Sequence, residues 1–172
     1  EKGIHTCLDT SGIMFPKKHT GTDQISEREI SLTGISENMA SDRMEKTEQL
    51  MSVTDLVMLD IKHINDEEHQ KLTGQSNSNI LAFAKYLDSI GKPVWIRHVV
   101  VPGITFDEKE LTELGLFLKT LHNVEKLEVL PYHSMGKIKY DNLGMDYVLK
   151  DTPQLTKAEA KEAENMIRAA MK

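Results

Sequence analysis

Cysteine is almost absent from this sequence, since Cys7 is the only one among its 172 residues. A single thiol cannot close an internal disulfide, so the composition fits a reducing compartment and predicts a cytoplasmic protein. A reactive thiolate needs exposure and a base or cationic neighbour, whereas Cys7 lies within an apolar run. We therefore expect Cys7 to be a half-buried packing residue rather than a nucleophile.

Excess positive charge and long apolar runs are also lacking. The sequence has 21 Lys and Arg against 27 Asp and Glu, for a net charge of −6, whereas nucleic-acid binding normally shows a basic footprint. The sequence contains no run of about 18 apolar residues, the length needed to span a membrane. It also contains no basic segment followed by an apolar one, as a signal peptide would. We expect no nucleic-acid partner and no membrane association.

The common phosphate and metal motifs are missing as well. Neither G-x-G-x-x-G nor a P-loop occurs, and the seven histidines show no H-x-H or H-E-x-x-H spacing. Nucleotide-phosphate cradles and mononuclear metal sites of these kinds are therefore weakly supported.

Apolar runs predict four strands, at 4–8, 56–61, 94–101 and 126–132. The second and third runs are nearly continuous in large apolar residues, which is typical of strands buried on both faces of a parallel sheet. No Asn-Gly or Asp-Gly pair joins two runs, so hairpins are not expected.

Helical patterns lie between and after these runs, at 66–73, 78–91, 107–121 and 156–172. The second helix is expected to bury one face carrying Leu81, Ala84, Leu87 and Ile90. The third and fourth begin with capping-box pairs, Asp107 with Glu110 and Thr156 with Glu159. Alternating strands and helices predict an α/β fold.

Polar residues at the expected strand ends, Asp60, Arg97 and His133, follow one another at nearly equal intervals. This regularity indicates successive β/α units of a barrel, or a piece of one, within a single domain spanning 1–172. Residues 15–46 are polar and break the rhythm, so we expect an insert or flexible loop there, with one helix leading into 47–53.

The strand ends predict a candidate site, because parallel strands bring their carboxyl ends to one rim. Its members are Asp9, Thr10, Asp60, Lys62, Arg97 and His133. Two carboxylates, two cations and an imidazole suit an anionic or zwitterionic ligand, with a small cation beside it. The alternative is that Asp60, Lys62 and Arg97 only form salt bridges at the rim.

Four segments occur in order along the chain: "GIHTCLDTSG", "VTDLVMLDIKH", "GKPVWIRHVVVPG" and "VEKLEVLPYHSMGKIKY". Together they resemble the pyruvate formate-lyase activating enzymes of the radical S-adenosylmethionine superfamily. The resemblance implies a partial (β/α)6 barrel, of which this chain would supply roughly the last four units. It also implies a [4Fe–4S] cluster and S-adenosylmethionine as cofactors. One electron from the cluster cleaves S-adenosylmethionine, and the resulting radical abstracts hydrogen from a glycine of a glycyl-radical partner enzyme.

The resemblance also assigns residues by position. Asp60, Ile61, Lys62 and His133 would contact S-adenosylmethionine, and Lys62, Arg97 and Val99 would line the region of the cofactor and the partner peptide. A monovalent cation would be held by Asp9, Thr10, Met58 and Asp60.

Two family features are absent: the C-x3-C-x2-C loop that ligates the cluster, and a glycine-rich "GGEP"-type segment. The resemblance places Cys7 in the third family strand, so no cluster ligand is expected here. We interpret the chain as a C-terminal part that is inactive alone. Its first strand would be covered by residues 15–46, by self-association or by a separately encoded half.

Two other readings stay open. The chain could be a non-catalytic remnant that still binds the partner enzyme or S-adenosylmethionine. It could also be an unrelated α/β-barrel lyase with Lys62 as the Schiff-base residue, although that reading leaves the four segments unexplained.

Overall fold

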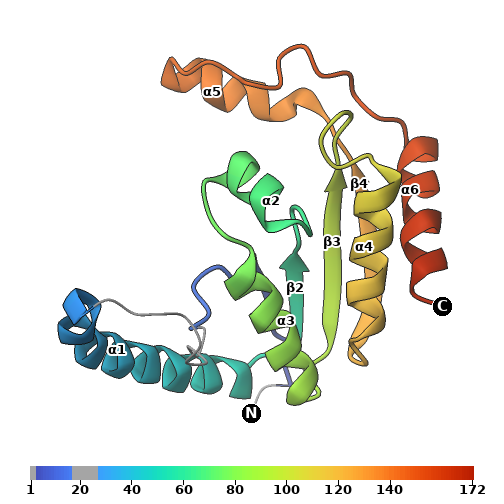
Figure 1. Cartoon of the computed structure of the whole chain (residues 1–172). Helices are drawn as coiled ribbons and strands as arrows, with labels where there is room; N and C mark the ends of the chain where they lie inside the picture. Colours follow the sequence, from blue (N-terminus) through green and yellow to red (C-terminus); the bar gives the residue numbers. More distant parts are fainter. Residues whose placement is uncertain (1–2, 17–26) are drawn as a thin grey trace.

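The computed structural model describes residues 3–16 and 27–172, and its centre is a four-stranded parallel sheet (Figure 1). The strands lie in chain order, β1-β2-β3-β4, and every neighbouring pair is parallel. The predicted α/β fold and the absence of hairpins among these strands are thus confirmed. The strands are β1 (Cys7–Thr10), β2 (Leu56–Asp60), β3 (Val94–Val100) and β4 (Val124–Pro131).

Helices fill the connections and follow the last strand. They are α1 (Glu27–Ser52), α2 (Asp66–Thr73), α3 (Ser78–Ser89), α4 (Glu108–Lys119), the 3-10 turn η1 (Ser134–Gly136), α5 (Lys137–Leu143) and α6 (Lys157–Ala170). None of the helices in the described part of the chain combines the length and the apolar composition that a membrane span requires.

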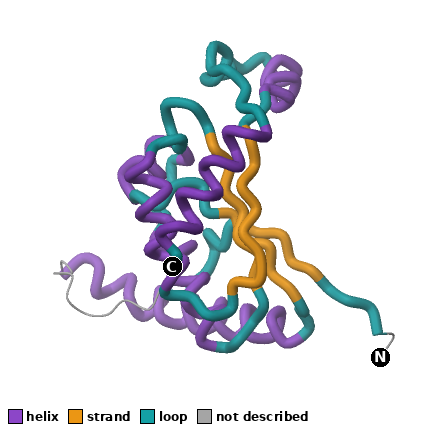
Figure 2. The backbone as a smooth tube through the Cα atoms, turned by 90° about the vertical axis from the view of Figure 1, so that its right-hand side faces the viewer, coloured by secondary structure: helices purple, strands orange, loops and turns teal. Residues whose placement is uncertain are grey.

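The helices that pack on the sheet lie on one side of it, and the other face is bare (Figure 2). The strand order never reverses, and right-handed crossovers then place each connecting helix on the same side. We call the bare side the open face. Its side chains alternate with core side chains along each strand, and on β3 they are Trp95, Arg97 and Val99.

The hydrophobic core lies between the sheet and helices α3, α4 and α6. Strand residues such as Leu59 and Ile96 and helix residues such as Leu114, Leu118 and Ile167 are fully buried there. The prediction that the second and third strands are buried on both faces is therefore wrong for this chain. Open-face side chains such as Met58, Trp95 and Val99 are only half-buried.

The first strand starts later than predicted, at Cys7, and Ile4 is 72% exposed. Thr6 explains the shift, because its backbone N–H and its hydroxyl both donate to Oδ2 of Asp55, at 2.7 and 2.9 Å. Cys7 is exposed, so its assignment as a half-buried packing residue is wrong. It points to the open face of an edge strand, where no described residue covers it.

Helix α3 buries Ile80, Phe83, Ala84 and Leu87. The expected stripe was partly wrong, since Ile90 is 44% exposed. Ile90 is the C-cap residue, so it no longer follows the helical period.

Helix α1 covers much of the segment that we expected to be a loop or insert. It begins at Glu27, well before 47–53, whereas residues 17–26 lie outside the described part. Whether the 15–46 segment is an insert stays a prediction.

Candidate functional site

Arg97 joins two carboxylates on the open face. Its Nε donates to Oδ1 of Asp60 at 2.7 Å, and its Nη2 donates to Oδ1 of Asp9. Lys62 Nζ donates to the other oxygen of Asp60, also at 2.7 Å. The side chains of Arg97 and Asp60 are each 20% exposed, and that of Asp9 is 54% exposed. We call these four residues the rim cluster.

Sheet register explains why the rim cluster forms. Asp60 of β2 and Arg97 of β3 are direct partners in the sheet, and Asp9 of β1 lies opposite Met58 of β2. Met58 and Asp60 share a face because side chains two apart along a strand point the same way. Arg97 is not at a strand end as predicted, since β3 continues to Val100. Its long side chain nevertheless spans both carboxylates.

The carboxylates hold Arg97 firmly in its charged form. Partial burial opposes the charge, but the hydrogen bonds that Arg97 donates to Asp60 and Asp9 outweigh it and raise the pKa of Arg97. Charge-assisted hydrogen bonds of this kind are stronger than neutral ones.

Three other residues assigned by resemblance lie apart from these contacts. The Ile61 side chain is fully buried in the core, and its carbonyl oxygen lies 2.8 Å from Nδ1 of His98. Val99 is half-buried on the open face, beyond Arg97. His133 is exposed where η1 begins. Its role in binding a ligand stays a prediction.

The proposed cation ligands are brought together only in part. The carboxylates of Asp9 and Asp60 converge, but Arg97 already pairs with both. Thr10 Oγ1 accepts a hydrogen bond from the backbone N–H of Gly12 at 3.0 Å. A monovalent cation would compete with Arg97 for the same carboxylate oxygens, and this ligand set also stays a prediction.

The residues of this chain do not fit a cysteine-ligated [4Fe–4S] cluster. Such clusters are held by several cysteine thiolates, and the chain has one cysteine. Nor do the described residues bring three or more His, Cys, Asp or Glu side chains together in a way that could hold a metal ion.

Lys62 shows no sign of a Schiff-base role. Schiff-base lysines are activated by desolvation or by a neighbouring cation. The Lys62 side chain is instead 39% exposed and paired with a carboxylate, that of Asp60. No observation favours the lyase reading.

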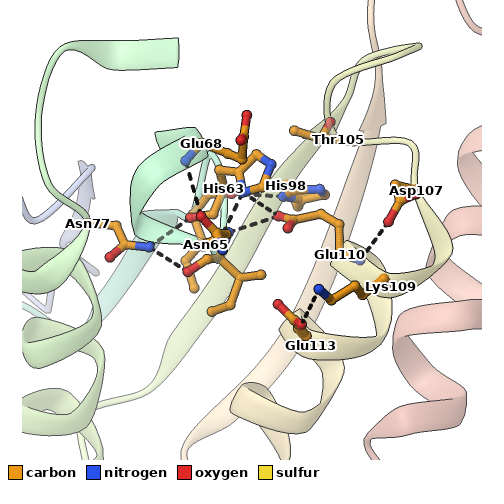
Figure 3. A network of polar contacts seen from close by, with 12 residues as sticks. His63, Asn65, Glu68, Asn77, His98, Thr105, Asp107, Lys109, Glu110 and Glu113 are labelled. Atoms are coloured by element: carbon orange, nitrogen blue, oxygen red, sulfur yellow. Dashed lines mark hydrogen bonds and ion pairs between the residues drawn. The ribbon is translucent and has the colours of Figure 1, made fainter. Parts of the chain in front are cut away.

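A second polar cluster lies at the same end of the sheet, on the helix side (Figure 3). His63 Nδ1 lies 3.0 Å from Oε1 of Glu110, and their side chains are 5% and 6% exposed. The same Glu110 oxygen accepts the backbone N–H of Ile64 at 2.9 Å. Asn77 Nδ2 donates to the carbonyls of His63 and Ile64, at 3.1 and 2.6 Å. We call His63 and Glu110 the buried pair.

Burial sets the protonation of this cluster. It raises the pKa of Glu110 to about 7 and lowers the pKa of His98 to about 4. It also lowers the pKa of His63. In each case burial disfavours the charged form.

Sequence reasoning missed the buried pair because it assigned Glu110 to a capping box. Asp107 does cap α4, accepting from the Glu110 N–H at 3.1 Å. The Glu110 side chain, however, turns away to Ile64 and His63. The capping box at Thr156 and Glu159 is confirmed, with both reciprocal hydrogen bonds present. A histidine following the polar end of β2 was the available signal for the pair.

Comparison with known proteins finds relatives that share one name. The chain is 44% identical over 170 residues to the pyruvate formate-lyase-activating enzyme of Streptococcus mutans, covering 97% of this chain and 55% of that protein. The corresponding enzyme of Staphylococcus epidermidis is 41% identical, over 94% of this chain and 55% of that protein. The chain therefore spans about half the length of these relatives. No protein-family model matches it.

A solved structure shares the fold. It is a domain of a pyruvate-formate lyase-activating enzyme from Bacteroides vulgatus, with a TM-score of 0.65 and 18% sequence identity. The match covers 98% of this chain and 78% of that one. At this identity the likeness supports the α/β architecture alone.

Proposed function

The chain belongs to the family of pyruvate formate-lyase-activating enzymes, and on that premise we propose that it is the part of such an enzyme that holds S-adenosylmethionine. The activity of the whole protein belongs to the proposal, since the chain spans about half the length of its relatives. The rim cluster is the observation that carries it.

The rim cluster has the chemistry that S-adenosylmethionine requires. Carboxylates such as Asp60 can accept hydrogen bonds from an ammonium group or ribose hydroxyls, and Lys62 and Arg97 can bind a carboxylate. When bound and reduced by one electron, the cofactor supplies a carbon radical. The residues of this chain would bind and orient it.

The proposed architecture is a partial (β/α) barrel whose interior is the open face. Helices on one side of an unreversed parallel sheet support it, because barrel strands follow one another in this order with their helices outside. A glycyl-radical enzyme of the pyruvate formate-lyase type is the proposed partner, in the cytoplasm. We also propose that these 172 residues are inactive alone, because they contribute only one thiol.

Nuclear magnetic resonance of the ¹⁵N-labelled chain tests cofactor binding directly. Millimolar S-adenosylmethionine should shift the amide signals of residues 60–62 and 97–99. Asp60→Asn should abolish these shifts, whereas Asp141→Asn, an exposed carboxylate on α5, should not. Absence of shifts, or shifts that are unchanged in Asp60→Asn, would contradict the proposal.

A chimera tests the activity. The matching segment of the Streptococcus mutans enzyme, 44% identical to this chain, would be replaced by this chain. Electron paramagnetic resonance should then detect a glycyl radical on pyruvate formate-lyase, and Asp60→Asn in the chimera should suppress it. A chimera that is folded and has its cluster but forms no radical would overturn the proposed activity.

A further inference from the structure

The contacts of His63 in the buried pair indicate which of its ring nitrogens carries a proton. His63 Nδ1 lies 3.2 Å from the backbone nitrogen of Asn65, whose N–H donates to it. An atom that accepts a hydrogen bond carries a lone pair, so the ring proton of neutral His63 lies on Nε2.

Glu110 lies against the same ring nitrogen. Its Oε1 is 3.0 Å from Nδ1, and both side chains are almost completely buried. A carboxylate oxygen and an imidazole lone pair are both acceptors, and two buried acceptors at this distance repel unless a proton lies between them. The contact is attractive when Glu110 is a carboxylic acid whose O–H donates to Nδ1.

The alternative is an ion pair, in which the proton has moved to His63. The backbone N–H of Asn65 would then point at an N–H group and lose its acceptor. Burial also favours the neutral pair, since it lowers the pKa of His63 and raises the pKa of Glu110, outweighing the hydrogen bond from the Ile64 N–H, which favours the carboxylate. The charged and titratable groups around the pair are Glu68 and His69 on α2, His98 on β3, Asp107 and Glu113 on α4, and Lys62. Of these, the three carboxylates further favour a neutral Glu110.

The pair is placed to control the rim. Glu110 also accepts the N–H of Ile64 at 2.9 Å, so it binds the loop after β2 at two points. Lys62 directly precedes this loop and pairs with Asp60 of the rim cluster.

We propose that Glu110 is a positioning residue that keeps its proton in weakly acidic solution and donates it to Nδ1 of His63, thereby holding the loop after β2 and Lys62 at the rim. Loss of that proton leaves two buried acceptors 3.0 Å apart, and their repulsion releases the loop from α4. Ligand binding at the rim then weakens as the pH rises and Glu110 loses this proton. This last consequence rests on the proposed function, whereas the shared proton does not.

Imidazole ¹⁵N shifts and amide exchange of the full chain test the proton. At pH 6 the His63 signals should show Nε2 protonated and Nδ1 hydrogen-bonded but not protonated. Between pH 6 and 8.5 the protection factor of the Ile64 amide, corrected for the intrinsic rate, should fall about tenfold, equivalent to one ordinary hydrogen bond. The midpoint should lie near pH 7, where Glu110 titrates.

Glu110→Gln is the informative variant. Its side-chain amide carries no titrating proton, so protection should be independent of pH. Glu108→Gln, on the same helix and exposed, should behave like the unaltered chain. A protonated Nδ1 at pH 6, or the same pH dependence in Glu110→Gln and the unaltered chain, would overturn the proposal. If Glu110→Gln does not fold, the histidine tautomer in the unaltered chain decides.

Titration with S-adenosylmethionine separates the two proposals. Affinity should fall about tenfold from pH 6 to 8.5 in the unaltered chain and stay constant in Glu110→Gln. Binding without this pH dependence would refute the positioning role while leaving the proposed function intact. No binding at any pH would refute both the proposed function and the positioning of the rim, and the ¹⁵N measurements would still decide where the proton lies.

Discussion

Gly115 lies where α4 and α6 touch, and Gly115→Ala there should destabilise the protein. A Cβ built at this position would lie 2.4 Å from the carbonyl oxygen of Ile167 and 2.6 Å from Cβ of Ala170. The first contact is with backbone in a helix, so it cannot be relieved by a side-chain rotation. Helix α6 would have to move away from α4 and from β4, on which it also packs.

Two effects of opposite sign set the magnitude. Alanine is favoured over glycine inside a helix by about 1 kcal/mol. Overpacking a well-packed core costs about 1–3 kcal/mol, and sometimes more. Because the clash here involves backbone, we expect the upper part of that range. The free energy of unfolding should fall by about 2 kcal/mol, which lowers the melting temperature by roughly 4–8 °C for a chain of this size.

Urea unfolding followed by circular dichroism measures this loss. Gly136→Ala is the matched control, since Gly136 has φ −63° and a Cβ added there would meet only Tyr147 Oη, at 3.9 Å. We expect the control to change the free energy of unfolding by less than about 0.5 kcal/mol. If Gly115→Ala proved as stable as the unaltered chain, the close packing of α4 on α6 would be refuted.

Three further changes test other parts of the structure. Thr156→Ala removes one arm of the capping box and should cost about 1 kcal/mol in urea unfolding; no loss would contradict the cap. Arg97→Met removes the partner of the Asp9 carboxylate and one of the two partners of Asp60 and should cost about 1–2 kcal/mol at pH 7. An unchanged free energy of unfolding would count against the pairing. Glu110 has its pKa raised from 4.5 to about 7 on folding, so the folded state binds more protons between these values and stability falls as the pH rises through them. Glu110→Gln lacks this proton and should gain up to about 3 kcal/mol relative to the unaltered chain between pH 4.5 and 8, and a constant difference over that range would refute the shift.

The elements of the fold could be predicted because they depend on local pattern. Apolar runs located β2 and β3 to within a residue, and α2 spans 66–73 as expected. The convergence of Asp60 and Arg97 also followed from strand position, although Arg97 lies inside β3 rather than at its end.

The errors arose where a residue's surroundings come from distant parts of the chain. Cys7 lies in an apolar run, but it is exposed because no described segment covers the open face. Glu110 fits a capping box by spacing, yet its side chain binds Ile64, which is 46 residues away. Local spacing indicates which contacts are available to a side chain, and tertiary packing decides which one forms.

The alternation of side chains at the end of β2 explains how the buried pair is linked to the rim cluster. Asp60 and Lys62 belong to the rim cluster, whereas Ile61 is in the core and His63 faces α4. Consecutive residues of an extended segment point to opposite sides, so four residues in a row connect the open face to the helix layer. If His63 moves away from Glu110, Lys62 moves with it, because the two residues are neighbours on one backbone. The position of the rim therefore depends on a contact that no ligand at the open face would touch.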